Sequence, residues 1–168
     1  MKSALKFIAF AFLTLAPLST YAQSNVAHIN VQQLISEMPE VIAAQNELAK
    51  LEKDYTTQID NAFKEFQTKA QSYSADAANQ TDVTNQARQK ELESMQTNLQ
   101  EFRDSAAQEL QKKQMDLMTP LLEKARNAIT KVGQEQGFDY VIDSSPNGGI
   151  ILADGKDLIE DVKRELGF

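Results

Sequence analysis

The chain has 168 residues, with 17 basic against 24 acidic side chains and no cysteine. The net charge of −7 argues against a nucleic-acid-binding protein, which needs clustered lysine and arginine to release counterions. It also disfavours attraction to anionic lipid head groups, and the lack of cysteine excludes disulfides and thiolate metal ligands.

Residues 1–22 predict a secretory signal peptide. Lys2 and Lys6 precede an apolar run from Phe7 to Ala16, which is too short to cross a bilayer core of about 30 Å. Small residues follow, and we expect cleavage after Ala22. The protein is therefore expected to be exported, without stable membrane insertion. Loss of the two lysines leaves 15 basic against 24 acidic residues, a net charge of −9.

Residues 23–38 predict the first part of a small β base. Val26–Val31 alternates and is rich in β-branched side chains, which indicates a strand. Val31–Met38 predicts a short helix or turn. It ends before Pro39, which suits the first turn of a helix.

Residues 39–136 predict a long antiparallel helical hairpin, here called the arm. Apolar residues recur every three or four positions from Val41 to Tyr73, and a similar but imperfect stripe, interrupted at Gln114, runs from Val83 to Leu121. A polar tip at residues 72–84 separates the two stretches. Each stripe is narrow on an otherwise polar helix, so we expect the two helices to pack on each other as a coiled coil. Thr81 or Asp82 is expected to cap the second helix.

Residues 137–168 predict the rest of the base. Phe138–Asp143 and Gly149–Ala153 are expected to form an antiparallel strand hairpin around a glycine-rich turn. A final helix should follow, opened by a capping box at Asp157–Glu160. The predicted fold class is therefore α+β, with the arm projecting from a small β base.

The predicted base is too small to stand alone, because three short strands do not make a self-sufficient core. We expect other subunits to complete it. The apolar residues expected at this interface are Val26, Ile29, Val31, Tyr140, Ile142, Ile150 and Leu152.

The segments VAHINVQQLISEMPE at 26–40 and QGFDYVIDSSPNGGIILADG at 136–155 enclose the helical hairpin, and this arrangement resembles the OmpH family. The resemblance implies a homotrimer whose strands assemble into one body, from which three arms project around a cavity. It implies an ATP-independent periplasmic holdase, a chaperone that keeps unfolded outer-membrane β-barrel proteins soluble. Basic arms in the family can attract lipopolysaccharide. Lipopolysaccharide binding is not expected here, since the chain is acidic and residues 72–84 contain no lysine or arginine.

Three apolar residues of the arm are expected to contact such clients: Phe63, Tyr73 and Val83. His28 is the only histidine, and no converging ligands accompany it, so we expect neither a metal nor a cofactor. No nucleophile, base and orienting group are arranged for catalysis, so an enzyme is not expected. The alternative function is a structural coiled-coil spacer or scaffold of the cell envelope without clients. Three features favour the holdase: the interrupted apolar stripe, Pro120 within the second helix, and a tip without a docking motif.

Overall fold

The computed structural model describes residues 24–146 and 148–168, so the predicted signal peptide lies outside the described residues. The elements in chain order are β1 (Val26–Ile29), α2 (Val31–Glu37), α3 (Pro39–Asp76), the 3-10 helix η1 (Ala77–Asn79), α4 (Asp82–Glu135), β2 (Tyr140–Asp143), β3 (Lys156–Asp157) and α5 (Ile159–Leu166).

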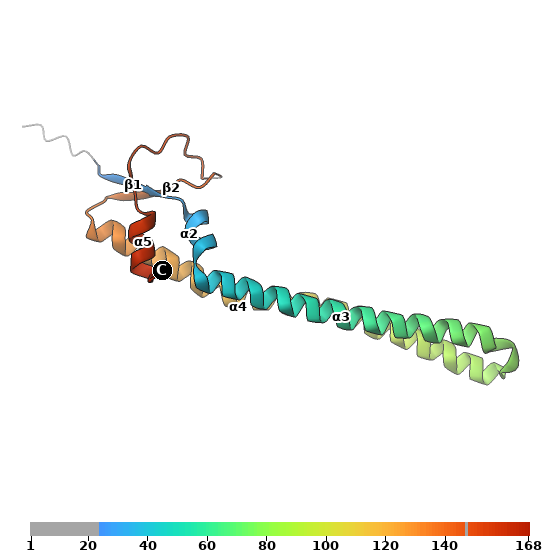
Figure 1. Ribbon diagram of the computed structural model, residues 1–168. Coiled ribbons are helices and arrows are strands. Elements are labelled where there is room, and N and C mark those ends of the chain that lie inside the picture. Colours follow the sequence, from blue (N-terminus) through green and yellow to red (C-terminus); the bar gives the residue numbers. More distant parts are fainter. Residues whose placement is uncertain (1–23, 147) are drawn as a thin grey trace, which may run out of the picture.

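The arm consists of α3 and α4, which lie side by side and project far from the base (Figure 1). Its helices begin where local chemistry predicts. Pro39 occupies the first turn of α3, and the Thr81 side chain accepts a hydrogen bond from Thr84 N at 3.2 Å at the start of α4. The 54 residues of α4 run through Pro120 without a break. The predicted fold class, long helices on a small sheet, is confirmed.

The predicted strand hairpin is wrong. The sheet has the order β2-β1-β3, and both pairings are parallel. Gly149–Ala153 is not a strand; the third strand is Lys156–Asp157, which pairs with the opposite edge of β1. Parallel neighbours need a long connection, and the whole arm serves as the crossover from β1 to β2.

His28 in β1 holds both ends of the loop that replaces the hairpin. Its Nδ1 lies 3.2 Å from Ser144 Oγ, and its Nε2 lies 3.2 Å from the carbonyl oxygen of Gly155. Gly155 itself comes so close to the β1 backbone that a Cβ there would lie 3.1 Å from the Val26 carbonyl oxygen. Because of these contacts, the chain after β2 crosses to the other edge of β1 and does not fold back to pair with β2.

The core lies where the inner face of the sheet packs on the base-proximal end of α4, with α2 and α5 closing it. Its buried apolar residues are Ala27, Ile29, Leu34, Met38, Val41, Ala125, Ala128, Val132, Leu158 and Val162. Gly133 permits the close approach of α4 to the sheet, because a Cβ there would lie 2.7 Å from Val141 Cγ2. Gly137, with φ of 75°, ends α4, and Phe138 N donates to Gly133 O at 2.9 Å.

The predicted capping box of the last helix is also wrong. The N-cap position of α5 is Leu158, whose side chain is fully buried in the core and makes no cap. Asp157 Oδ1 instead accepts from Ile159 N at 3.0 Å, and Glu160 accepts from Lys163 at 3.0 Å. The core therefore selects an apolar residue at the position where the capping box needs a polar one.

Candidate functional site

The middle of the arm is packed through a small set of apolar contacts. Tyr55 and Phe102 meet edge to face with ring centroids 6.0 Å apart, and Leu99 and Ala106 are buried nearby. These side chains hold α3 against α4. Their main role is packing within the arm, where Tyr55 and Phe102 are half-buried.

Phe63 is one of two candidate contact residues that the structure leaves exposed. It is 40% exposed and stacks on Phe66 with centroids 6.5 Å apart. The pair borders a depression of about 490 Å³, to which α4 contributes Leu99, Gln100 and Arg103. Phe63 lies beside the apolar stripe rather than within it, which is the signal that identified it in the sequence.

Tyr73, in contrast, takes part in the packing of the arm itself. Its hydroxyl donates to Glu91 Oε2 at 2.6 Å, and the guanidinium of Arg88 lies 4.7 Å from its ring centroid. Lys69 Nζ donates to the other Glu91 oxygen at 2.6 Å. The hydrogen bonds from Lys69 and Tyr73 hold the pKa of Glu91 below its usual value, and the hydrogen bond to Glu91 raises the pKa of Tyr73. The ring is half-buried, so only part of it faces solvent.

The tip is held by further polar contacts. Asp76 accepts from Arg88 Nη2 at 3.1 Å and from Gln80 Nε2 at 2.7 Å, and the bond from Arg88 lowers the pKa of Asp76. Asn85 Nδ2 donates to Ala77 O at 2.9 Å. Val83 points away from this network and is 77% exposed. The sequence analysis did not predict this network, although charged residues at positions where the two helices meet indicated it.

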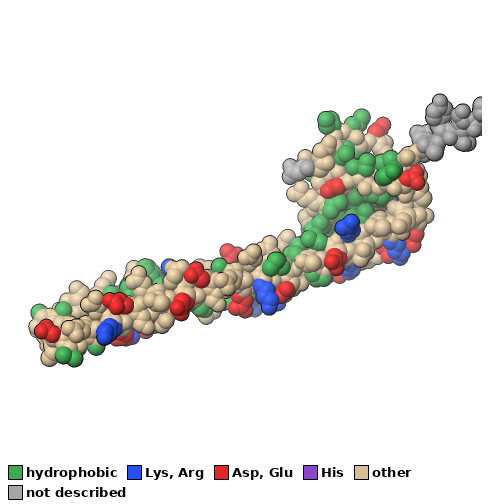
Figure 2. Space-filling model, turned by 180° about the vertical axis from the view of Figure 1, so that it is seen from behind, with side chains coloured by type: hydrophobic (Ala, Val, Ile, Leu, Met, Phe, Trp, Pro, Cys, Tyr) green, Lys and Arg blue, Asp and Glu red, His purple; other side chains and the backbone are tan. Residues whose placement is uncertain are grey.

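The base carries a second exposed apolar surface. Figure 2 shows hydrophobic side chains gathered over the base and scattered more thinly along the arm, among acidic and basic groups. Val26, Tyr140 and Ile142 share the outer face of the sheet, and the Ile150–Leu152 segment of the loop is exposed as well.

Two of the residues expected at a subunit interface belong instead to the subunit's own packing. Ile29 is only 1% exposed, because the alternation along β1 turns it and Ala27 toward the core. Val31 is half-buried and packs against that core. Ile29 is therefore covered by the subunit's own core, and its contribution to a subunit interface stays a prediction.

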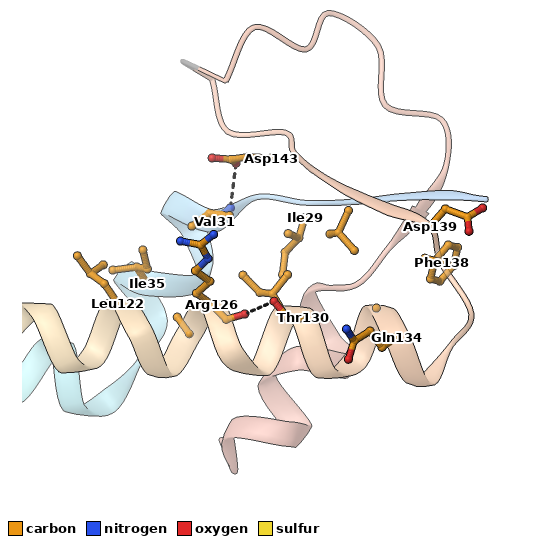
Figure 3. Close-up of a pocket in the computed structure, with 14 residues that line it drawn as sticks. Ile29, Val31, Ile35, Leu122, Arg126, Thr130, Gln134, Phe138, Asp139 and Asp143 are labelled. Carbon is orange, nitrogen blue, oxygen red and sulfur yellow. Dashed lines mark hydrogen bonds between the residues drawn. The ribbon is translucent and has the colours of Figure 1, made fainter. Parts of the chain in front are cut away.

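A groove lies between the sheet and α4 (Figure 3), with a volume of about 510 Å³. Its apolar lining includes Ile35, Leu122 and Phe138. Asp143 at its rim is already engaged, since its Oδ1 accepts from Val31 N at 3.3 Å and from Ser145 Oγ at 2.6 Å. The lining is therefore mainly apolar and includes three charged residues, Arg126, Asp139 and Asp143.

Two further features were searched for in residues 24–146 and 148–168. No group of three or more His, Asp or Glu side chains there is arranged to hold a metal ion. No helix in that part of the chain is long and apolar enough to cross a membrane.

Comparisons with known proteins agree with this architecture. The family model described as "Outer membrane protein (OmpH-like)" matches residues 25–166. The chain is 26% identical over 160 residues to the chaperone protein Skp of Yersinia enterocolitica, covering 92% of this chain and 93% of that protein. The crystal structure of an OmpH-like protein from Caulobacter crescentus superimposes with a TM-score of 0.76 at 13% identity, covering 86% of this chain and 85% of the other. This chain belongs to the OmpH-like outer membrane protein family.

Proposed function

We propose that the chain is an ATP-independent periplasmic holdase chaperone. In this proposal it binds unfolded outer-membrane β-barrel proteins between its arms and prevents their aggregation before membrane insertion. Membership in the OmpH-like family and the likeness to the Skp chaperone of Yersinia enterocolitica support it. Export through a signal peptide cleaved after Ala22 belongs to the same proposal.

The observation that carries the proposal is the arm. Two long helices project from the core with a seam that buries few large side chains, and they leave Phe63 and Val83 exposed. Dispersed apolar residues on a polar support suit many weak contacts with an unfolded chain. We propose Phe63 and Val83 as client contacts, with the open part of the Tyr73 ring as a lesser one.

The base is proposed to hold three subunits together. Its outer sheet face and the Ile150–Leu152 segment expose several large apolar side chains, and exposed apolar clusters are typical of interaction surfaces. Light scattering on the chain from residue 23 should give three times the subunit mass. Deleting residues 44–113 and joining the ends with a short linker should leave the trimer intact. A monomer at micromolar concentration, or one produced by the deletion, would contradict assembly through the base.

The decisive test of function is suppression of aggregation. A urea-unfolded outer-membrane β-barrel protein is diluted into buffer with and without the purified chain from residue 23, in the absence of ATP, and turbidity is followed. The holdase proposal predicts lower turbidity at a few trimers per client. A spacer protein predicts the same turbidity as buffer alone.

Client capture should depend mainly on apolar contacts. The mature chain has a net charge of −9, so it cannot attract acidic client chains over long distances as a basic chaperone would. Affinity should therefore change by less than about threefold between low and moderate salt. Replacing both Phe63 and Tyr73 by serine should weaken capture without dissociating the trimer, whereas Lys64→Glu serves as an exposed control with little effect. A steep loss of binding with salt, together with a silent serine variant, would show charge-driven capture.

A further inference from the structure

Two depressions of the arm lie on the same side of α4. The first contains Gln96, Gln100 and Arg103, and the second contains Ala107, Gln111 and Gln114. These residues follow one another at steps of three or four, so they project from one side of the helix. The two depressions therefore follow one another along one side of α4, and together they are here called the glutamine groove, which comprises these six residues and the side chains beneath them.

The glutamine groove combines an apolar floor with a rim in which glutamines outnumber charged residues. Leu99 and Phe66 lie in its first depression, and Leu48 and Leu110 lie in its second. Three residues that line the two depressions are charged, namely Glu52, Glu101 and Arg103, and the four glutamines of α4 are exposed. A glutamine amide both donates and accepts hydrogen bonds, so it can pair with any peptide group whatever the side chain.

We propose that the glutamine groove binds one membrane strand of an unfolded outer-membrane protein in an extended conformation; this rests on the holdase function proposed above. Such a strand carries apolar side chains at every second residue and has unpaired peptide N–H and C=O groups on its edges. The apolar side chains enter the two depressions. The glutamine amides pair with the exposed peptide groups.

The dimensions of the groove match this occupant. From Gln96 to Gln114 the helix rises about 27 Å, a length that about eight residues of extended chain cover. Membrane strands have about ten residues of alternating hydrophobicity. The floor residues Leu99 and Leu110 are about 16 Å apart along the helix, so side chains about four to six residues apart in an extended client reach both depressions.

Photo-cross-linking tests the position of the client. A benzophenone amino acid is introduced at Gln100 or Gln111 in the groove, and at Asn98 or Ser105 as matched exposed sites on the opposite side of α4. The trimer is loaded with a urea-diluted outer-membrane β-barrel protein and irradiated. We expect strong cross-links to the client from positions 100 and 111 and at most weak ones from 98 and 105. Mass spectrometry should find the cross-links in predicted membrane strands rather than in loops.

A second measurement tests the amides. The double variant Gln100→Glu, Gln111→Glu removes two amide donors and keeps helix-forming side chains. It should weaken client affinity about tenfold, whereas Asn98→Asp with Ser105→Asp, which adds the same charge on the opposite side, should change it less than about twofold. Circular dichroism verifies that both variants retain their helices.

The possible outcomes separate this inference from the holdase function itself. Equal cross-linking from both sides, with aggregation still suppressed, overturns the glutamine groove and leaves the function standing. Cross-links between arms in the absence of client also overturn it, since the groove would then be an interface between copies of the chain. Failure of the unmodified chain to suppress aggregation overturns both proposals.

Discussion

The base and the arm are stabilised in different ways. The largest fully buried side chains, Ile29, Leu34, Met38, Val41, Leu158 and Val162, all lie in the base or in the first turn of the arm. Farther along the arm, the buried apolar residues are Ala44, Leu99 and Ala106. Toward the tip, ion pairs and hydrogen bonds such as Lys69–Glu91 join half-buried apolar residues in holding the two helices together. The base thus has a core of fully buried side chains, whereas the two arm helices are joined by a single narrow row of contacts.

This difference bears on local stability. Burial of apolar area supplies most of the free energy that opposes unfolding, and exposed ion pairs add little. Segments with few buried apolar contacts open at a lower free energy than the core does. We expect the arm to open locally while the base stays folded, a mobility that the proposed holdase function would use.

The largest expected effect is a loss of core volume in the base. Leu34→Ala should lower the free energy of unfolding by about 3 to 5 kcal/mol, because Leu34 is fully buried in the core. Leu99→Ala in the arm should cost about 2 to 3 kcal/mol, since a thin seam can relax around the lost atoms. Urea unfolding of both variants measures the difference. Equal losses would mean that the arm is packed as firmly as the base.

Overpacking at the junction of α4 and the sheet should have an intermediate effect. Gly133→Val adds side-chain atoms where Val141 Cγ2 already lies 2.7 Å from a Cβ position, so we expect a loss of about 2 kcal/mol. Gln134→Val changes the next, exposed residue of the same helix and should cost less than about 0.5 kcal/mol. If thermal unfolding found the two variants alike, the close approach of α4 to β2 would be contradicted.

Acid should loosen the outer part of the arm. The folded-state pKa values of Glu91 and Asp76 lie below their ordinary values of 4.5 and 3.8, because each carboxylate accepts hydrogen bonds from a cationic partner. Their stabilising contribution is present above those ordinary values and is lost as the pH falls through the lowered ones. Amide exchange between residues 69 and 91, compared with exchange in β1 after correction for the intrinsic rate, should therefore accelerate below about pH 4.

Glu91→Gln is the control for the acid effect, because it removes the titrating group and keeps the size of the side chain. It should raise exchange near the tip at pH 7 and reduce its dependence on pH. At neutral pH the native tip should already exchange faster than β1. Protection at residues 73–83 equal to that in β1 would refute the view of a mobile arm.

The smallest effect is expected at the exposed end of the tip. Val83→Ser should change the free energy of unfolding by less than about 0.5 kcal/mol, because Val83 is 77% exposed. Its effect on client affinity is a separate measurement. Tyr73→Phe, which removes only the hydroxyl that bonds to Glu91, should cost about 1 kcal/mol and so separates a structural contact from an exposed one.

Local sequence signals predicted the arm well. The spacing of apolar residues is a property of neighbours three or four apart, and Pro39 and Thr81 act within their own first turn. These interactions do not depend on the rest of the molecule. The exposed position of Phe63 followed from the same spacing, and its expected contact with clients stays a prediction.

The arrangement of the base was decided by contacts between distant residues. Residues 150–152 have the composition of a strand, yet the His28 bonds to Ser144 and Gly155 direct the chain to the other edge of β1. The polar network of the tip joins residues up to 22 positions apart, as between Lys69 and Glu91. Helices arise from short-range periodicity that the sequence displays directly. Strand order, the burial of Ile29 and the pairing of charges across the arm depend on which segments meet in space, and only the tertiary structure determines that.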